Sequence, residues 1–294
     1  MPTSERYVVI FHAGCTDGMA AAWALRAAFR ASTSARLHPL SADALTFLPM
    51  HYGDPLDVEA LRGKSVYVLD FSFPRATLLA LKEAADFLIV LDHHKTAQAD
   101  LEGLPFCTFD VERSGAGLTW DEVTEGYCGE RPPIIDYVED RDLWRFKLPR
   151  SREVGAALQE LPVGVPGQPL DFEAWDRAAQ MPVEQLAAMG LLHQATAQRL
   201  AKVIARHAQP AVLAGHACKV AVTAVLQSEV GELLTAEHPM GVTCFQREDG
   251  KWVYSLRSRS DFDVSEVARQ FGGGGHAQAA GFTADEPAHW ARQP

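Results

Sequence analysis

The sequence predicts an α/β protein with an N-terminal parallel-sheet domain, a smaller α/β C-terminal domain and a long helix joining them. Three observations lead to this prediction. The N-terminal half alternates short apolar runs with helical periods, which is typical of a parallel sheet covered on both faces. A long helical pattern follows at residues 182–207, and the rest of the chain has strand and helix patterns of its own. Because 294 residues exceed one ordinary core, two domains are expected.

The elements of the N-terminal half follow from apolar runs and helical spacing. The stretch from Leu40 to Pro55 is punctuated by Pro and Gly, so no strand is predicted there. The predicted strands are Tyr7–Phe11, a weaker Arg36–Leu40, Val66–Phe71 and Phe87–Leu91. The predicted helices are Gly18–Arg30, Pro74–Ala85, Gly115–Thr124 and Pro133–Val138.

The C-terminal half begins after a cluster of Pro and Gly at Leu161–Pro169. The long helix is predicted at Pro182–His207, and Pro210 ends it. We therefore expect a first domain at residues 1–162, a linker with the connecting helix at 163–210, and a second domain at 211–294. The predicted C-terminal elements are the strands Cys218–Leu226, Gly241–Phe245 and Trp252–Arg257 and the helices Val230–Glu237 and Val264–Phe271.

Composition limits the possible locations and partners. No apolar run is long enough to span a bilayer, and the first residues do not resemble a signal peptide, so no membrane contact is expected. Five cysteines without close pairing predict reduced thiols and a cytoplasmic protein. The net charge of −11 argues against binding along long duplexes. It leaves a nucleotide substrate open, because bound divalent cations would reverse the local field.

Acids and imidazoles follow each strong strand of the N-terminal half. The first strand is followed by His12, Cys15 and Asp17, the second by Asp70, and the third by Asp92, His93 and His94. In a parallel sheet these carboxyl ends meet at one edge. Each residue alone could be a helix cap, a turn residue or a core histidine. Their recurrence predicts a site for two metal ions, in which a bridging carboxylate and activated water carry out phosphoryl transfer.

With these motifs the chain resembles the DHH phosphoesterase superfamily, which includes RecJ-type exonucleases and small-oligonucleotide nucleases. The resemblance implies that His12 and Asp70 hold one Mn²⁺ ion. It implies that Asp17, Asp70, His93 and a further Asp hold the second, with Asp70 bridging. It also implies that His94 contacts the scissile phosphate, so that His94, Asp70 and Asp17 are the catalytic residues. Asp92 would orient an imidazole from outside the ligand shell.

Three acids compete for the position of the further Asp. Asp140 ends an apolar helical segment, as the corresponding acid does in the superfamily, and is the predicted ligand. Asp136 lies on the same helical face and is the fallback, whereas Asp142 is expected to pair with Arg141 or Arg145.

Cys15 departs from the family pattern, which has an acid at this place. A thiolate could ligate metal, although it favours softer ions than Mn²⁺. Alternatively, Cys15 only packs, and one metal position is weaker.

A glycine-rich segment at Gly272–Gly275 is the second strong signal. It lacks the composition of a flexible linker, and Ala277–Ala280 is expected to begin a helix, so the backbone could cradle an anion at the helix start. The segment resembles the glycine-rich motif of the C-terminal domain that accompanies the DHH domain in exonucleases. By this resemblance the nucleotide is bound by Gly273, Gly274, Gly275, His276 and an upstream Arg, which is Arg257 with Arg259 in reserve.

The sequence thus predicts a manganese-dependent phosphodiesterase, an exonuclease that hydrolyses short single-stranded oligonucleotides to mononucleotides. Mg²⁺ remains possible as the ion, and the protein would be a monomer or a homodimer. Two alternatives stay open: a phosphodiesterase for linear or cyclic dinucleotides or a nucleotide bisphosphate phosphatase, and a catalytically weak nucleic-acid-binding module.

Overall fold

The computed structural model describes residues 6–31, 44–124, 130–259 and 261–285. The predicted strand Arg36–Leu40 lies outside these residues. The chain forms two compact units. One consists of Met1–His93 with Ala97–His193, and the other of His94–Thr96 with Gln194–Pro294. The predicted α/β class with a parallel sheet and a second sheet is confirmed.

The first unit is built on a five-stranded parallel sheet with the strand order β2-β1-β3-β4-β5. Its strands are β1 (Tyr7–His12), β2 (Leu45–Met50), β3 (Ser65–Leu69), β4 (Phe87–Asp92) and β5 (Cys107–Phe109). The chain passes from β1 to β2 on one side and then to β3 on the other side of β1. The direction of winding therefore reverses between β1 and β3, which is where open α/β sheets bind ligands.

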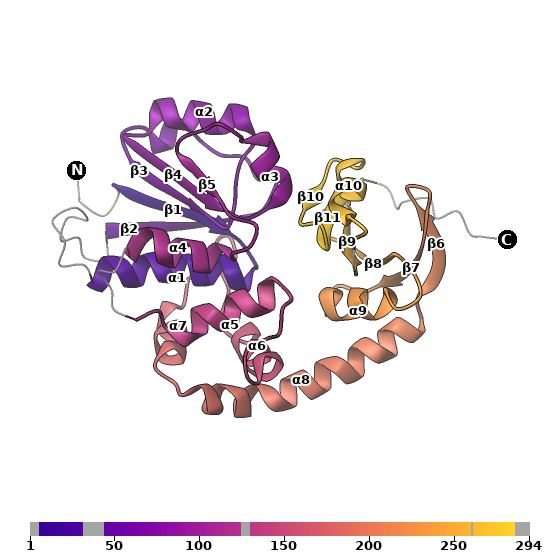
Figure 1. The fold of residues 1–294 in the computed structure, drawn as a ribbon. Helices are drawn as coiled ribbons and strands as arrows, with labels where there is room; N and C mark the ends of the chain where they lie inside the picture. Colours follow the sequence, from indigo (N-terminus) through magenta and orange to yellow (C-terminus); the bar gives the residue numbers. More distant parts are fainter. Residues whose placement is uncertain (1–5, 32–43, 125–129, 260, 286–294) are drawn as a thin grey trace. The chain divides into compact units, whose positions relative to one another are not determined.

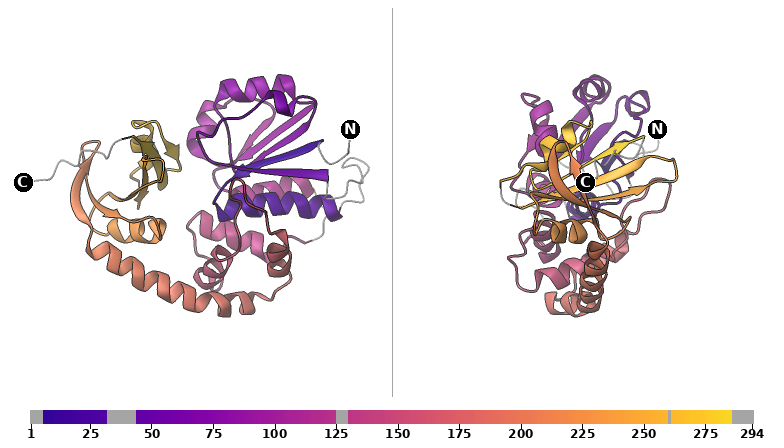
Figure 2. Two further views of the ribbon diagram at one scale, coloured as in Figure 1. Left: turned by 180° about the vertical axis from the view of Figure 1, so that it is seen from behind. Right: turned by 90° about the vertical axis from the view of Figure 1, so that its right-hand side faces the viewer.

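Helices cover both faces of this sheet, as Figure 1 shows. One face carries η3 (Glu59–Leu61), α2 (Arg75–Ala84) and α3 (Lys95–Asp100). The other carries α1 (Thr16–Ala31) and α4 (Gly115–Thr124), with α5 (Pro133–Asp142), α6 (Ser151–Gln159) and α7 (Phe172–Ala179) beyond them. The left view of Figure 2 shows the indigo α1 and the purple α2 on opposite sides of the strands. Each face has its own apolar core, so every central strand is buried on both sides.

Strand β2 is the main difference from the predicted first unit, because no strand was expected between Leu40 and Pro55. Among the residues that the structure describes it pairs with β1 alone and forms an edge of the sheet. Pro49, which lacks an N–H group, is tolerated at such an edge. Proline was therefore a misleading signal at this position.

The second unit contains a six-stranded sheet with the order β10-β11-β9-β8-β7-β6, in which only β7 and β8 are parallel. Its strands are β6 (Gln209–Leu213), β7 (His216–Val222), β8 (Met240–Gln246), β9 (Trp252–Ser258), β10 (Gly274–Gly275) and β11 (Ala279–Ala284). Helix α10 (Val264–Arg269) packs on one face. Helix α9 (Gln227–Leu234) and the end of α8 (Val183–Arg206) pack on the other.

Helix α8 begins in the first unit and ends in the second, as expected for the connecting helix. The predicted linker at residues 163–210 contains α7 as well, and Trp175 of α7 is fully buried in the core of the first unit. Pro210 follows the helix but belongs to strand β6, again at a sheet edge. Within the described residues no helix combines the length and apolarity needed to cross a membrane.

The expected helix at Ala277–Ala280 is wrong. These residues lead into β11, which pairs with β10 and with β9. Phe282 of β11 stacks on Tyr254 and on Phe271, with ring centroids 4.5 Å apart in both pairs. This stacking and the β9 ladder favour a strand, although the alanines alone would favour a helix.

Candidate metal centre and nucleotide-binding residues

The carboxyl ends of β1, β3 and β4 bring acids and imidazoles to one edge of the parallel sheet. His12 is the last residue of β1, Asp70 follows β3 directly, and Asp92 ends β4 just before His93. Because β1, β3 and β4 are neighbours in the sheet, residues far apart in the sequence meet here. The structure therefore brings together residues that the sequence presents on three separate strands.

Asp70 lies at the centre of this group. Its carboxylate is buried, with Oδ1 3.0 Å from His93 Nε2 and Oδ2 3.5 Å from His12 Nδ1. Oδ2 of Asp70 faces the His12 imidazole, and a hydrogen bond with this imidazole lowers the pKa of the carboxyl. The backbone of Asp70 is left-handed, with φ of 51°, a conformation that non-glycine residues adopt at some energetic cost and often at functional sites. A buried carboxylate that attracts two imidazoles is well suited to a cation.

Asp17 is held by the start of α4. The Gly115 N–H donates to Oδ2 of Asp17 at 2.6 Å, and the Ala116 N–H donates to Oδ1 at 3.0 Å. The helix N-terminus thus stabilises the buried carboxylate and fixes its orientation. Oδ2 of Asp17 also lies 3.6 Å from His93 Nε2.

Two glycines make these close approaches possible. A Cβ atom at Gly115 would lie 2.4 Å from Cβ of Asp70, and one at Gly18 would lie 2.3 Å from the carbonyl oxygen of His12. Neither distance is compatible with a side chain. The glycines therefore allow α4 and α1 to begin directly against the group of acids and imidazoles.

Asp142, the last residue of α5, reaches the same group. Its Oδ2 lies 3.7 Å from His93 Nε2, and ligand atoms of Asp17, His93 and Asp142 all lie within 4.8 Å of one another. Asp142 was expected to pair with an arginine instead. One sequence signal pointed to this position: Asp142 lies four residues after Val138 and so shares its buried helical face.

Asp140, the predicted ligand, has other partners. Its carboxylate accepts hydrogen bonds from the N–H groups of Lys147 and Leu148 at 2.9 and 3.1 Å and from the Ser151 hydroxyl at 2.5 Å. The fallback, Asp136, forms an ion pair with Arg131, with Oδ1 2.8 Å from Nε. The three hydrogen bonds give Asp140 a structural role in closing the loop after α5.

The electrostatics of this group reflect several buried acids beside two imidazoles. Burial alone would lower the pKa of His93, but Asp70, Asp142 and Asp17 raise it well above its usual value. Burial and the neighbouring charges of Asp70 and Asp142 raise the pKa of Asp17 well above its usual range. Burial would raise the pKa of Asp70, yet contacts with the two imidazoles hold it well below its usual range.

The donor set fits a divalent cation. Three carboxylates and two imidazoles supply mixed oxygen and nitrogen ligands, and the raised pKa values of His12 and His93 show that the site attracts positive charge. Cys15 lies beside them: burial and the Asp70 charge raise the pKa of its thiol, and a hydrogen bond with His12 opposes the rise. The thiol is therefore protonated unless a cation displaces the proton.

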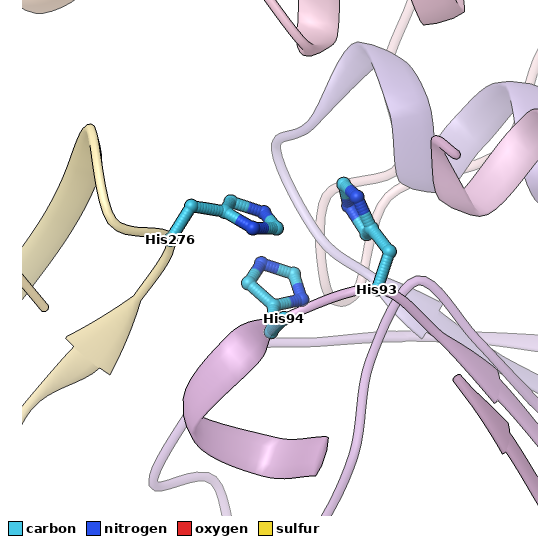
Figure 3. Close-up of side chains that lie close together, drawn as sticks. All are labelled: His93, His94 and His276. Carbon is cyan, nitrogen blue, oxygen red and sulfur yellow. The ribbon is translucent and has the colours of Figure 1, made fainter. Parts of the chain in front are cut away.

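The remaining residues of the Asp92-His93-His94 run differ in their surroundings. Asp92 is fully buried and accepts hydrogen bonds from the Ser72 hydroxyl and from the His93 N–H, the latter at 2.8 Å. It fixes the backbone of His93, consistent with a role outside the ligand shell. His94 is half-buried and follows His93 directly, as the close-up in Figure 3 shows.

The nucleotide-binding residues predicted for the second unit lie on its sheet. Arg257 is on β9, where its guanidinium donates to the hydroxyls of Ser228 and Ser255 at 2.7 and 3.1 Å. His276 lies in the turn between β10 and β11, and Figure 3 shows its imidazole. Its N–H donates to the carbonyl of Ala279 at 2.8 Å.

The glycines before His276 are required by this hairpin rather than by a helix start. A Cβ atom at Gly273 would lie 2.1 Å from the Gly281 carbonyl oxygen, and Gly275 has φ of 136°. Gly274 and Gly275 form β10 itself. The expected cradle at a helix N-terminus is therefore replaced by a hairpin turn.

A family model matches most of the second unit. Residues 216–292 match the model of the DHHA1 domain. Over 93% of its length the chain is 28% identical to the uncharacterized protein R106 of Acanthamoeba polyphaga mimivirus. It spans 66% of that relative.

Solved structures resemble the chain in fold. One is described as the DHH domain of a member of the s1p family of ribosomal proteins. It has a TM-score of 0.52 and 13% identity, covering 95% of this chain and 83% of that one. Another is the pGpG-specific phosphodiesterase PggH from Vibrio cholerae, with a TM-score of 0.48 and 12% identity, covering 94% and 92%.

Proposed function

We propose that the chain, whose residues 216–292 match the DHHA1 domain model, is a metal-dependent phosphodiesterase of the DHH superfamily that acts on short single-stranded oligonucleotides. The observation that carries the proposal is the group formed by His12, Asp17, Asp70, His93 and Asp142 at the switch point of the parallel sheet. Structural acids seldom gather in this way, because buried like charges repel one another.

Each residue has a proposed task. Asp70, with one oxygen toward each imidazole, would bridge two positions for Mn²⁺: His12 would complete one, and Asp17, His93 and Asp142 the other. Asp142 takes the place of Asp140 in this assignment, because Asp140 is occupied by three donors. Bound divalent cations would supply a nucleophilic water at neutral pH and neutralise charge on the phosphoryl oxygens.

The chain itself would bind and orient the substrate. His94 would donate a hydrogen bond to an oxygen of the scissile phosphate, where negative charge develops. In the second unit the Arg257 guanidinium, the hairpin glycines Gly273–Gly275 and His276 would hold a nucleotide through its phosphate or ribose. Recognition of a nucleotide in addition to the phosphate would separate this chain from enzymes that act on pyrophosphate alone.

The test is a substrate panel with protein that has been stripped of metal and reloaded with Mn²⁺ or Mg²⁺. The panel contains five- and twenty-nucleotide RNA and DNA labelled at either end, a linear and a cyclic dinucleotide, an adenosine bisphosphate and pyrophosphate. Release of mononucleotides from the short single strands is expected. Turnover of pyrophosphate alone would contradict the proposal, and RNA binding without any turnover would favour a binding module.

Two variants control this experiment. Asp70→Ala should abolish turnover of every substrate, because it removes the bridging carboxylate. Asp86→Ala changes an exposed Asp that directly precedes β4, at the end of the strand opposite to the proposed metal ligands, and should leave turnover unchanged. Full activity in Asp70→Ala would show that the chemistry takes place elsewhere.

A further inference from the structure

Tyr52 is an aromatic residue that lies beside the proposed metal ligands and has no role in the argument so far. It follows β2, and its ring centroid lies 5.4 Å from that of His12 and 4.6 Å from that of Phe71. Even with these contacts the residue is 50% exposed. A single exposed aromatic is ordinary on a protein surface. Its position next to a metal ligand is what sets Tyr52 apart.

The hydroxyl end of Tyr52 is fixed in place. The Ser72 N–H donates to the phenol oxygen, and the Ser72 hydroxyl in turn donates to Asp92. The polar end is thus anchored in the protein, while part of the ring faces solvent.

An anchored ring with exposed surface has the properties of a stacking platform. Every nucleobase has a π-face, so stacking on an aromatic side chain tolerates any sequence. A ring that is already fixed loses little conformational freedom when a base stacks on it. Because Tyr52 adjoins His12, a nucleoside stacked there has its phosphate within reach of the proposed metal ions.

We infer that Tyr52 binds a nucleobase of the substrate by stacking, next to the scissile phosphate. The inference rests on the proposed function and extends it, since it places a base-binding residue in the first unit, where only phosphate chemistry had been assigned. It would also give the first unit a preference for nucleotides over pyrophosphate that does not depend on the DHHA1 domain.

The competing role for Tyr52 is purely structural: its ring could serve to orient the imidazole of His12. The two roles differ in what the variants change. Loss of a stacking platform raises KM and weakens nucleotide binding while Mn²⁺ affinity stays the same. Loss of support for His12 lowers Mn²⁺ affinity, and nucleotide binding falls only as a consequence.

The experiment uses the full chain with Tyr52→Ala, Tyr52→Phe and Tyr52→Trp. The matched control is Phe87→Ala, since Phe87 is also exposed, at 43%, but lies at the amino end of β4. The probe is 2-aminopurine riboside 5′-monophosphate, whose fluorescence is quenched by stacking and which, as a mononucleotide, is not consumed. Mn²⁺ affinity is measured separately by calorimetric titration.

Tyr52→Ala should abolish the quenching and raise KM for a dinucleotide by roughly 5- to 150-fold, at unchanged Mn²⁺ affinity. Tyr52→Phe and Tyr52→Trp should retain the quenching because they retain a ring. Unchanged quenching in Tyr52→Ala, or a loss of Mn²⁺ affinity as large as the loss of nucleotide binding, would overturn the inference. If the wild-type protein turns over no substrate, the proposed function fails, while the quenching experiment still decides whether Tyr52 stacks a base.

Discussion

Two acids near the end of α5, Asp140 and Asp142, should respond in opposite ways to the same substitution. The structure gives Asp140 three internal donors and places Asp142 beside His93 and Asp17. Asp140→Asn should therefore destabilise the protein and leave the metal site intact. Asp142→Asn should weaken metal binding and leave the metal-free protein as stable as before.

The magnitudes follow from these contacts. In Asp140→Asn the amide N–H₂ group faces the N–H groups of Lys147 and Leu148 or the Ser151 hydroxyl, which are themselves donors. At least one hydrogen bond to a charged acceptor is therefore lost. Such bonds contribute about 1.5–3 kcal/mol each, which predicts a loss of at least about 1.5–3 kcal/mol. For a unit of this size each kcal/mol lowers Tm by about 2–4 °C.

Asp142→Asn removes a proposed metal ligand. Loss of a residue that only supports a ligand costs about 10–100-fold in metal affinity, so loss of a ligand should cost at least that much. It also removes a negative charge that repels Asp17 and attracts the protonated His93, and these two effects on the metal-free protein oppose each other. The metal-free variant should therefore be about as stable as the wild type.

The assay pairs thermal unfolding in the presence of a chelator with calorimetric titration of Mn²⁺, for wild type and both variants. The expected pattern is a lower Tm with normal Mn²⁺ binding for Asp140→Asn, and a normal Tm with weak binding for Asp142→Asn. The reverse pattern would refute the assignment of Asp142 and reinstate Asp140 as the ligand.

Three further predictions test other contacts. Gly115→Ala should lower Mn²⁺ affinity roughly 5- to 150-fold, because its Cβ would lie 2.4 Å from Cβ of Asp70 and such overpacking costs about 1–3 kcal/mol. A Mn²⁺ titration curve of the variant that equals that of the wild type would contradict this prediction. Asp176→Asn should cost about 1 kcal/mol at pH 7 in urea unfolding, because three donors lower the pKa of this partly exposed carboxyl. The stabilisation is present above the ordinary Asp pKa of about 3.9 and is lost as pH falls through the lower folded-state pKa, so an equal difference at pH 2 and pH 7 would refute it. Cys15→Ala should reduce Mn²⁺ affinity more than Cys107→Ala does, and identical titrations of the two variants would exclude a metal role for Cys15.

The sequence predicted the centre of the first unit well because its signals there are local. Apolar runs mark β1, β3 and β4, and acids or imidazoles stand directly at or after their ends. In a parallel sheet the positions of the strands alone then bring His12, Asp70 and His93 together. No knowledge of the loops is needed for that part of the site.

The parts of the fold and of the site that the sequence did not predict depend on contacts between segments that are distant in the sequence. The position of Asp142 is set by where α5 ends and how it packs, whereas Asp140 was favoured by its place after an apolar segment. Strand β11 forms because it pairs with β9 and because its Phe282 ring stacks on Tyr254. The local helix or strand propensity of Ala277–Ala280 could not indicate either contact. Local pattern fails where a partner elsewhere in the chain decides the conformation.

The proposed metal ligands at the switch point would couple metal supply to folding. The unfolded chain has no site, because residues from His12 to Asp142 meet only when the parallel sheet is complete. An ion bound only by the folded state adds stability by mass action, about 2.7 kcal/mol at a free concentration one hundred times Kd. A chelator would therefore act on this protein as a mild denaturant, and the ion concentration would set how much of the chain is folded as well as how fast it turns over.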